Sequence, residues 1–227
     1  MIGILKGSSI YNGNAIYNDG TGGGGGGGET YPADYSGPIS LGGKTYQTVK
    51  IGNKIWMSEN LDYRWEGLSD DMTILSAAAN YYNGDSSLYG DNGLIYNGYA
   101  VLELVIKLSN GLLDGWRVPD DSDFLDIPKE FIKNDFNPYG VAVVNPQWHS
   151  PVLTNLKSSD YWDGNNSFGF NLRRCGLYQG GWVNIENYTC LWIKTGTGHY
   201  DFGNGNYITS NNNNPDFGCS IRLCKNL

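Results

Sequence analysis

The side chains that most often carry catalysis are sparse in this sequence. Hydrolysis needs a nucleophile beside a base, or two spaced carboxylates in a cleft, yet the chain has only two histidines, His149 and His199. Neither belongs to an HExxH motif, and there is no GxSxG, phosphate-binding glycine loop or dinucleotide fingerprint. We interpret His149 as a packing residue of a loop and His199 as an exposed loop residue. The sequence therefore predicts that the protein is not an enzyme.

Acidic residues provide the candidate calcium ligands. The pair Asp70-Asp71 is typical of a solvated turn, and the run from Asp120 to Asp123 is typical of a helix N-terminus. The segment GDSSLYGDNG, with Asp85, Asp91 and Asn92, has the oxygen ligands that calcium prefers but not the spacing of an EF-hand. We predict no metal and no cofactor.

The four cysteines all fall in the last quarter of the chain: Cys175, Cys190, Cys219 and Cys224. They permit three disulfide pairings in an oxidising compartment and none in the cytosol. The spacing of Cys219 and Cys224 in CSIRLC could bind a metal, although no CxxC or neighbouring histidine accompanies them. We expect small buried apolar residues, or one disulfide near the C-terminal strand.

From Arg173 to Asn214 the chain interleaves aromatic and amide side chains with glycine. Tyr and Trp provide large contact area at low entropic cost, and Asn provides adaptable hydrogen bonds, as in antibody paratopes. Trp192 and Phe170 are assigned to the core instead. The sequence predicts a ligand-recognition surface made by Arg174, Tyr178, Trp182, Asn184, His199, Tyr200, Asn204, Asn206 and Tyr207.

A two-stranded ribbon is predicted well before this stretch. Thr48 to Met57 carries β-branched and aromatic residues on both sides of the turn pair Gly52-Asn53. Pairing across the turn sets Val49 opposite Trp56. With Ile51 they form one apolar face, while Lys50 and Ile55 point the other way.

Two helices are predicted in the middle of the chain. Tyr96 to Asn110 has apolar residues at helical spacing, stopped by Asn110-Gly111. A short strand at WRVP, ended by Pro119, leads into a second helix that Pro128 interrupts or kinks. After Tyr161 the periodicity fades, and we expect loops to dominate the last third.

Composition limits the partners. The formal net charge is −8 and no basic run occurs, so a nucleic-acid partner is not expected. The first twenty residues do not show the pattern of a secretory signal, and no apolar run is long enough for a membrane span, so we do not expect membrane insertion.

Seven glycines, Gly22 to Gly28, divide the chain. We predict an N-terminal docking segment at residues 1–20, a Gly-rich linker at 21–40 and one domain at 41–227. Strand-like pieces at Ser8 to Tyr11 and Ala15 to Tyr17 flank Asn12-Gly13, a hairpin signal. Because such a hairpin is marginal alone, we expect it to dock onto an identical chain or a larger assembly, with a disordered leader as the alternative.

Four motifs resemble, in order, those of the Fibrobacter succinogenes major paralogous domain: TVKIGNKIWMSENL, GLIYNGYAV from Gly93, GWRVPDDSDF from Gly115 and GFNLR from Gly169. The closing segment from Phe217 is also similar, although Leu223 stands where the family has its terminal cysteine and Cys224 follows. The resemblance covers roughly Leu41 to Leu227. It implies an α+β, C-type-lectin-like fold with two helices, short antiparallel strands and long loops.

The resemblance also implies a binding role. Such proteins are similar to variable proteins of diversity-generating retroelements, in which randomised Asn codons yield residues such as Tyr, His and Ser but never Trp or Lys, and unmutated ones leave runs like Asn211 to Asn214. We expect a ligand-binding or receptor-binding adhesion module in the virion of a bacteriophage, at a tail tip or fibre, that binds a cell-surface protein or glycan. The alternative is a bacterial surface or secreted lectin-like protein. A further alternative is an oxidase on a related fold that uses Cys219 and Cys224.

Overall fold

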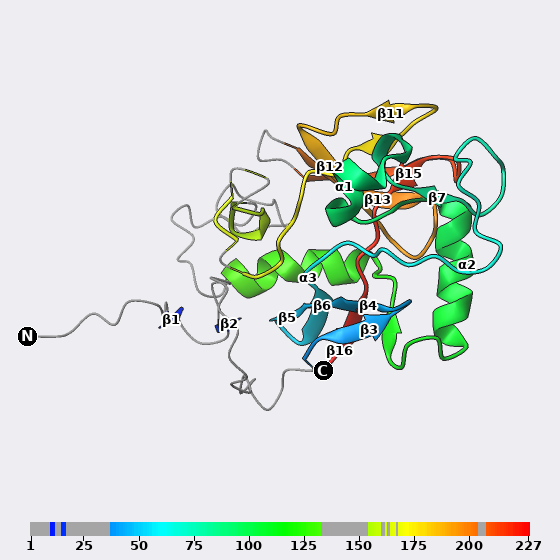
Figure 1. The fold of residues 1–227 in the computed structure, drawn as a ribbon. Helices are drawn as coiled ribbons and strands as arrows, with labels where there is room; N and C mark the ends of the chain where they lie inside the picture. The colour runs from blue at the N-terminus through cyan, green and yellow to red at the C-terminus, as the bar shows by residue number, and fades with distance from the viewer. Residues whose placement is uncertain are drawn as a thin grey trace, which may run out of the picture.

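The computed structural model describes residues 10–11, 15–16, 37–132, 154–159, 162, 164–166, 168–203 and 208–227. Within them the chain is a mixed α+β fold of short helices and many antiparallel strands (Figure 1). The helical elements are η1 Tyr82–Gly84, α1 Ser86–Tyr89, η2 Gly90–Asn92, α2 Gly98–Ser109 and α3 Asp121–Ile132. The two predicted helices are α2 and α3, and α1 adds a single turn.

The predicted ribbon forms one edge of a four-stranded sheet. β5 Thr48–Ile51 and β6 Lys54–Met57 pair with Val49 opposite Trp56, and Gly52 in their turn has a φ of 65°. The last strand, β16 Cys224–Asn226, pairs with β6, and β9 Trp116–Arg117 pairs with β16. The beginning and the end of the domain are therefore held side by side. A separate hairpin, β3 Ile39–Leu41 with β4 Lys44–Tyr46, precedes this sheet.

This four-stranded sheet separates two apolar clusters, as the alternation in the ribbon predicts. Trp56 and Ile51 face a cluster that includes Phe124 of α3. Ile55 faces a second cluster, which includes Leu104 of α2. Both faces of the sheet are therefore packed, and they position the two long helices.

The remaining strands form two further sheets. The five-stranded sheet has the spatial order β11 Trp182–Val183, β10 Leu177–Tyr178, β15 Gly218–Cys219, β8 Ile95–Asn97 and β7 Ala79–Asn80. The three-stranded sheet consists of β12 Tyr188–Trp192, β13 Gly198–Gly203 and β14 Ile208–Asn212. A single disulfide between Cys190 and Cys219 joins them, and Cys175 and Cys224 remain free thiols.

In the last third of the chain, β12, β13 and β14 include the longest strands described, although most described residues there still lie outside helices and strands, as expected. Every residue of β13 is buried. Its polar residues His199 and Asp201 alternate with Tyr200 and Phe202, but they lie inside the protein, so the strand is buried on both faces and not half-buried.

Both helices begin at side-chain caps. Asn97 accepts a hydrogen bond from the backbone of Ala100 at the start of α2, and Asp120 accepts one from Asp123 at the start of α3. The predicted end of α2 is confirmed, since Asn110 is its C-cap. Pro128 does not interrupt α3, which continues to Ile132, and the alternative of a kink stays a prediction.

Near the N-terminus, β1 Ile10–Tyr11 and β2 Ala15–Ile16 pair as an antiparallel hairpin, as Asn12-Gly13 predicts. The rest of the docking segment and most of the Gly-rich linker lie outside the described residues, so the domain boundaries stay a prediction. None of the described helices combines the length and apolar character needed to cross a bilayer.

A buried ionic cluster joins α3 to the four-stranded sheet. Asp123 is 2% exposed and binds the guanidinium of Arg117 through both oxygens. The Lys54 ammonium lies 3.5 Å from Asp123 and 2.8 Å from Asp126. Since Asp123 is the fully buried anion between two cations, its charge is structurally more important than that of the partly exposed Asp126.

Replacing Asp123 with Asn tests this cluster. The substitution leaves Lys54 and Arg117 without their shared buried anion, so we expect D123N to lower the free energy of unfolding by about 3–5 kcal/mol. The matched change D126N, at a partly exposed partner of the same lysine, should cost about 0–1 kcal/mol. Urea unfolding of both variants measures the difference, and equal small losses would contradict the assignment.

Candidate functional site

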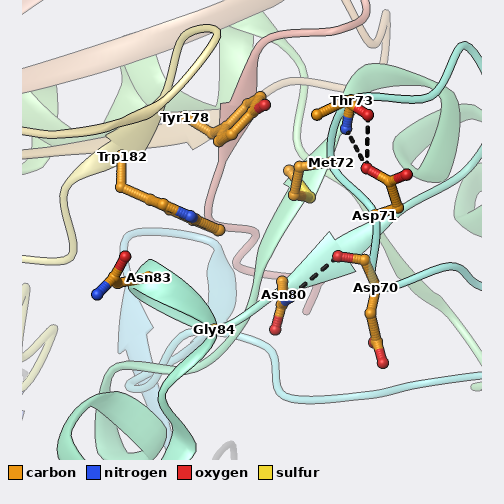
Figure 2. A pocket seen from close by; sticks show the side chains of 9 residues that line it. All are labelled: Asp70, Asp71, Met72, Thr73, Asn80, Asn83, Gly84, Tyr178 and Trp182. Atoms are coloured by element: carbon orange, nitrogen blue, oxygen red, sulfur yellow. Dashed lines mark hydrogen bonds between the residues drawn. The ribbon is translucent and has the colours of Figure 1, made fainter.

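A hollow of about 280 Å³ lies between the β10–β11 hairpin and the segments around β7. Figure 2 shows Tyr178 and Trp182 on one side of it and Asp70, Asp71 and Thr73 on the other. Its lining residues are Asp70, Asp71, Met72, Thr73, Asn80, Asn83, Gly84, Tyr178 and Trp182. The hollow thus brings an aromatic wall opposite carboxylate and amide groups.

The aromatic wall is fixed by a tight hairpin. Tyr178 of β10 and Trp182 of β11 are direct cross-strand partners, and their rings meet edge-to-face with centroids 5.2 Å apart. Tyr82 contacts the Trp182 ring at 5.5 Å, and Tyr89 supports Tyr82 at 5.1 Å. Gly176, with a φ of 65°, leaves room for Tyr82, since a Cβ there would lie 2.6 Å from the tyrosine ring. Trp182 is thereby held in place while part of its surface stays exposed.

Gly218 sits beneath the aromatic wall. It pairs with Tyr178 across β15 and β10. A Cβ at Gly218 would lie 2.8 Å from Tyr178 and 2.9 Å from both Met72 and Ile95. Two of these three residues line the hollow, so the absence of a side chain at Gly218 sets how closely its walls approach.

The polar wall is a turn organised by its own side chains. Asp71 Oδ1 accepts hydrogen bonds from the backbone N–H of Thr73 at 2.9 Å and from its hydroxyl at 2.6 Å. The Thr73 hydroxyl and backbone hydrogen bonds lower the pKa of the Asp71 carboxyl. Asn80 donates to the carbonyl of Asp70, whose carboxylate pairs with Arg64. The prediction of a solvated turn at Asp70-Asp71 is confirmed by the exposure of both residues.

Nothing in the sequence indicates that this turn faces Tyr178 and Trp182. About a hundred residues separate the two walls in the chain, and each wall alone is typical of an ordinary surface loop. The signal in the sequence was limited to the paratope-like composition of the hairpin.

The predicted recognition residues do not form one surface. Tyr178 and Trp182 line the hollow, and Asn184 is exposed just after β11 with a φ of 61°. Arg174 is half-buried, with its guanidinium 5.8 Å from the centre of the Trp162 ring. Three further predicted residues lie outside the described part of the chain: Asn204, Asn206 and Tyr207.

The prediction that His199 and Tyr200 belong to the recognition surface is wrong, because the structure places both side chains in the core. His199 is 2% exposed, stacks on Phe217 at 4.9 Å and has Nε2 3.3 Å from Asp201. Tyr200 is 4% exposed and stacks on Phe124 at 4.6 Å, and burial raises the pKa of its hydroxyl. The prediction that His199 is an exposed loop residue is wrong. Neither side chain faces solvent, because β13 is covered on both sides.

Comparison with models of known protein families assigns the chain to one of them. The family model of the Fibrobacter succinogenes major domain matches residues 49–225, most of the 227-residue chain. The chain belongs to this family. No curated protein and no solved structure matched it. In this Fibrobacter succinogenes major domain, all residues that line the hollow fall within the matched range, as does the β6–β16 pairing up to Lys225.

The candidate metal ligands have other roles in this Fibrobacter succinogenes major domain. Cys219 is bonded to Cys190, while Cys175 and Cys224 are buried thiols. The structure therefore does not contain the reactive Cys219–Cys224 pair that an oxidase would need. Asp85 caps α1 through the backbone N–H groups of Ser87 and Leu88. Among the described residues no group of three or more His, Cys, Asp and Glu side chains could hold a metal ion.

A methyl group at Gly218 should disturb the hollow. We expect Gly218→Ala to lower the free energy of unfolding by about 1–3 kcal/mol, because the extra atom overpacks Tyr178 and Met72. Gly90→Ala is the matched control, since its Cβ would meet no atom within 4 Å and its backbone is already helical. That control should be neutral or stabilising by about 0.4–1 kcal/mol. Chemical unfolding and near-ultraviolet circular dichroism test this, and a Gly218→Ala variant as stable as wild type would refute it.

The Thr73 hydroxyl should control the acidity of Asp71. The pKa of the Asp71 carboxyl is lowered in the folded protein. Its ionised form therefore stabilises the fold at pH values above the unfolded pKa, and this contribution to stability is lost as the pH falls through the folded pKa. Thr73→Val removes the hydroxyl donor, so the pKa of Asp71 should rise toward its ordinary value. Carboxyl-carbon NMR titration measures the shift. Thr45→Val, at an exposed threonine that pairs with Ser40, should leave Asp71 unchanged, and an unshifted Asp71 in Thr73→Val would argue against the assignment.

Proposed function

We propose that this protein is a ligand-binding adhesion module that uses the hollow between the β10–β11 hairpin and the Asp70–Thr73 turn. The supporting observation is the aromatic pair Tyr178 and Trp182 facing polar side chains across an open depression. Rigid aromatic rings with a few convergent polar groups are the usual make-up of a binding site. Membership of the Fibrobacter succinogenes major domain family is compatible with this role and does not define a ligand.

The fold that we propose is C-type-lectin-like. Two twelve-residue helices, short antiparallel strands and closure of the domain by its last strand support this proposal. In such an arrangement a packed scaffold carries loops that determine binding. The Cys190–Cys219 disulfide, in the strands behind the hollow, suits an oxidising environment such as a virion or the cell exterior.

Attachment at the N-terminal end completes the proposal. Residues 1–20 would dock the chain to a virion or to further copies of itself, and the glycine run would act as a tether. Display of several copies would raise avidity for a cell-surface protein or glycan without new contacts. A bacterial surface or secreted protein would use the same binding site. Phage tail genes beside this gene would favour the virion, and a leader sequence upstream of it would favour the bacterial surface.

Diversification by a retroelement would leave part of this site constant. Randomised Asn codons cannot yield Trp, so Trp182 would belong to the unvarying frame of the hollow. Asn83 and Asn184, both exposed and both in the left-handed backbone region, are compatible with such codons. A template repeat near the gene that differs at adenines would support the idea.

Binding to bacterial cells tests the adhesion role. Fluorescently labelled full-length chain should bind a subset of cell types in a panel, and Trp182→Ala should weaken binding at least about tenfold, because truncating a central aromatic commonly costs more than about 2 kcal/mol. Ile106→Ala removes an exposed apolar side chain on α2, which does not line the hollow, and should have no effect. Flow cytometry gives the apparent affinities. Equal cell binding by wild type, Trp182→Ala and Ile106→Ala would contradict the proposed site.

A further inference from the structure

Four polar groups at the hollow have hydrogen-bonding capacity that the protein does not use. The Tyr178 hydroxyl, the Trp182 Nε1–H and the Asn83 side-chain amide make no hydrogen bond within the described part of the chain, and neither does Asp71 Oδ2. Thr73 occupies only the other Asp71 oxygen, as Figure 2 shows. Donors and acceptors gathered beside an aromatic surface are therefore available to a ligand.

These groups determine the ligand chemistry. A hydroxyl and an indole N–H donate, a carboxylate oxygen accepts, and an amide does both. Vicinal hydroxyls on a saturated ring match such a mixture, and the ring's C–H face can pack on the indole of Trp182. An organic cation would also suit the aromatic wall and the carboxylates. It would, however, provide no acceptors for the Tyr178, Trp182 and Asn83 donors, so it would use fewer of the available groups than a polyhydroxylated ring.

The charge and the size of the hollow restrict the class of ligand further. Asp70 and Asp71 both line the hollow, and none of its lining residues is basic. Arg64 pairs with Asp70, so Asp71 supplies the uncompensated negative charge. A carboxylate-bearing sugar would be repelled there. The volume of about 280 Å³ lies just below the roughly 300–1,000 Å³ typical of ligand pockets, so it suits one ring at a time.

We propose that the hollow binds one neutral saccharide residue, stacked on Trp182 and held through its hydroxyls by Asp71, Asn83 and Tyr178. This inference rests on the proposed adhesion function and specifies its ligand class. Because the hydroxyls bind the protein groups directly, no bridging calcium ion takes part.

The test uses the full chain and immobilised oligosaccharides that end in glucose, galactose, mannose, N-acetylglucosamine, glucuronate or sialate. At least one neutral terminus should bind ten or more times as tightly as either acidic one. Trp182→Ala should abolish that binding, and Trp182→Phe should retain part of it. Asp71→Asn should reduce affinity for the neutral sugar and narrow its advantage over the acidic sugars. EDTA should change nothing, and Ile106→Ala should match wild type.

Several outcomes would overturn the inference, and they leave the adhesion role separately testable. Preference for acidic sugars, loss of sugar binding in EDTA, or tight binding of choline in place of the sugars would each refute it. Cell binding that needs Trp182 but survives periodate oxidation of the cell-surface glycans would refute the proposal of a saccharide ligand. It would still support the proposed adhesion role. Absence of both sugar and cell binding would remove both proposals.

Discussion

Arg222 carries a fully buried guanidinium on the segment between β15 and β16, and the rest of the domain is arranged around it. Its Nε donates to the Asn60 side chain at 2.8 Å, while its terminal nitrogens donate to the backbone carbonyls of Phe170 and Asn171. The Phe170 ring lies 4.4 Å from the guanidinium carbon. Burial lowers the pKa of the group. A buried cation is tolerated only when its donors are satisfied, so three remote segments must meet around Arg222 for the chain to fold.

The constraint at Arg222 extends to the hollow through Asn60. The Asn60 amide also donates to the carbonyl of Asn92 and to the sulfur of Cys175. Cys175 directly precedes Gly176, where the chain enters β10 and leaves space for Tyr82 behind Trp182. A continuous set of buried contacts therefore connects the closing segment with the aromatic wall, and the position of the hairpin follows from the packing of the core.

The sequence predicted the parts of this fold that depend on local spacing. The ribbon register, α2 and the cap of α3 each follow from residues within a few positions of one another. The sequence did not predict β13, because its polar residues His199 and Asp201 are buried, whereas polar residues in such a stretch indicate an exposed segment. The disulfide could not be chosen either, since Cys190 and Cys219 meet only after β12 and β15 are placed. Only the aromatic wall of the hollow was predicted from the sequence. The polar wall was not, because Asp71 and Trp182 come together only once the five-stranded sheet has formed.

The residues around the hollow differ in how firmly they belong to the scaffold, and this difference determines where binding specificity can change. Gly218 and Tyr178 are packed between strands, so altering them disturbs the sheet itself. Asn83 and Trp182 project from a short helical turn and an edge strand, and their outer surfaces meet solvent. Substitution of a solvent-facing side chain away from buried contacts usually costs little stability. For the proposed adhesion role, this arrangement would allow Asn83 to change while Arg222 and the buried sheet keep the aromatic wall in position, which separates a constant frame from a variable surface.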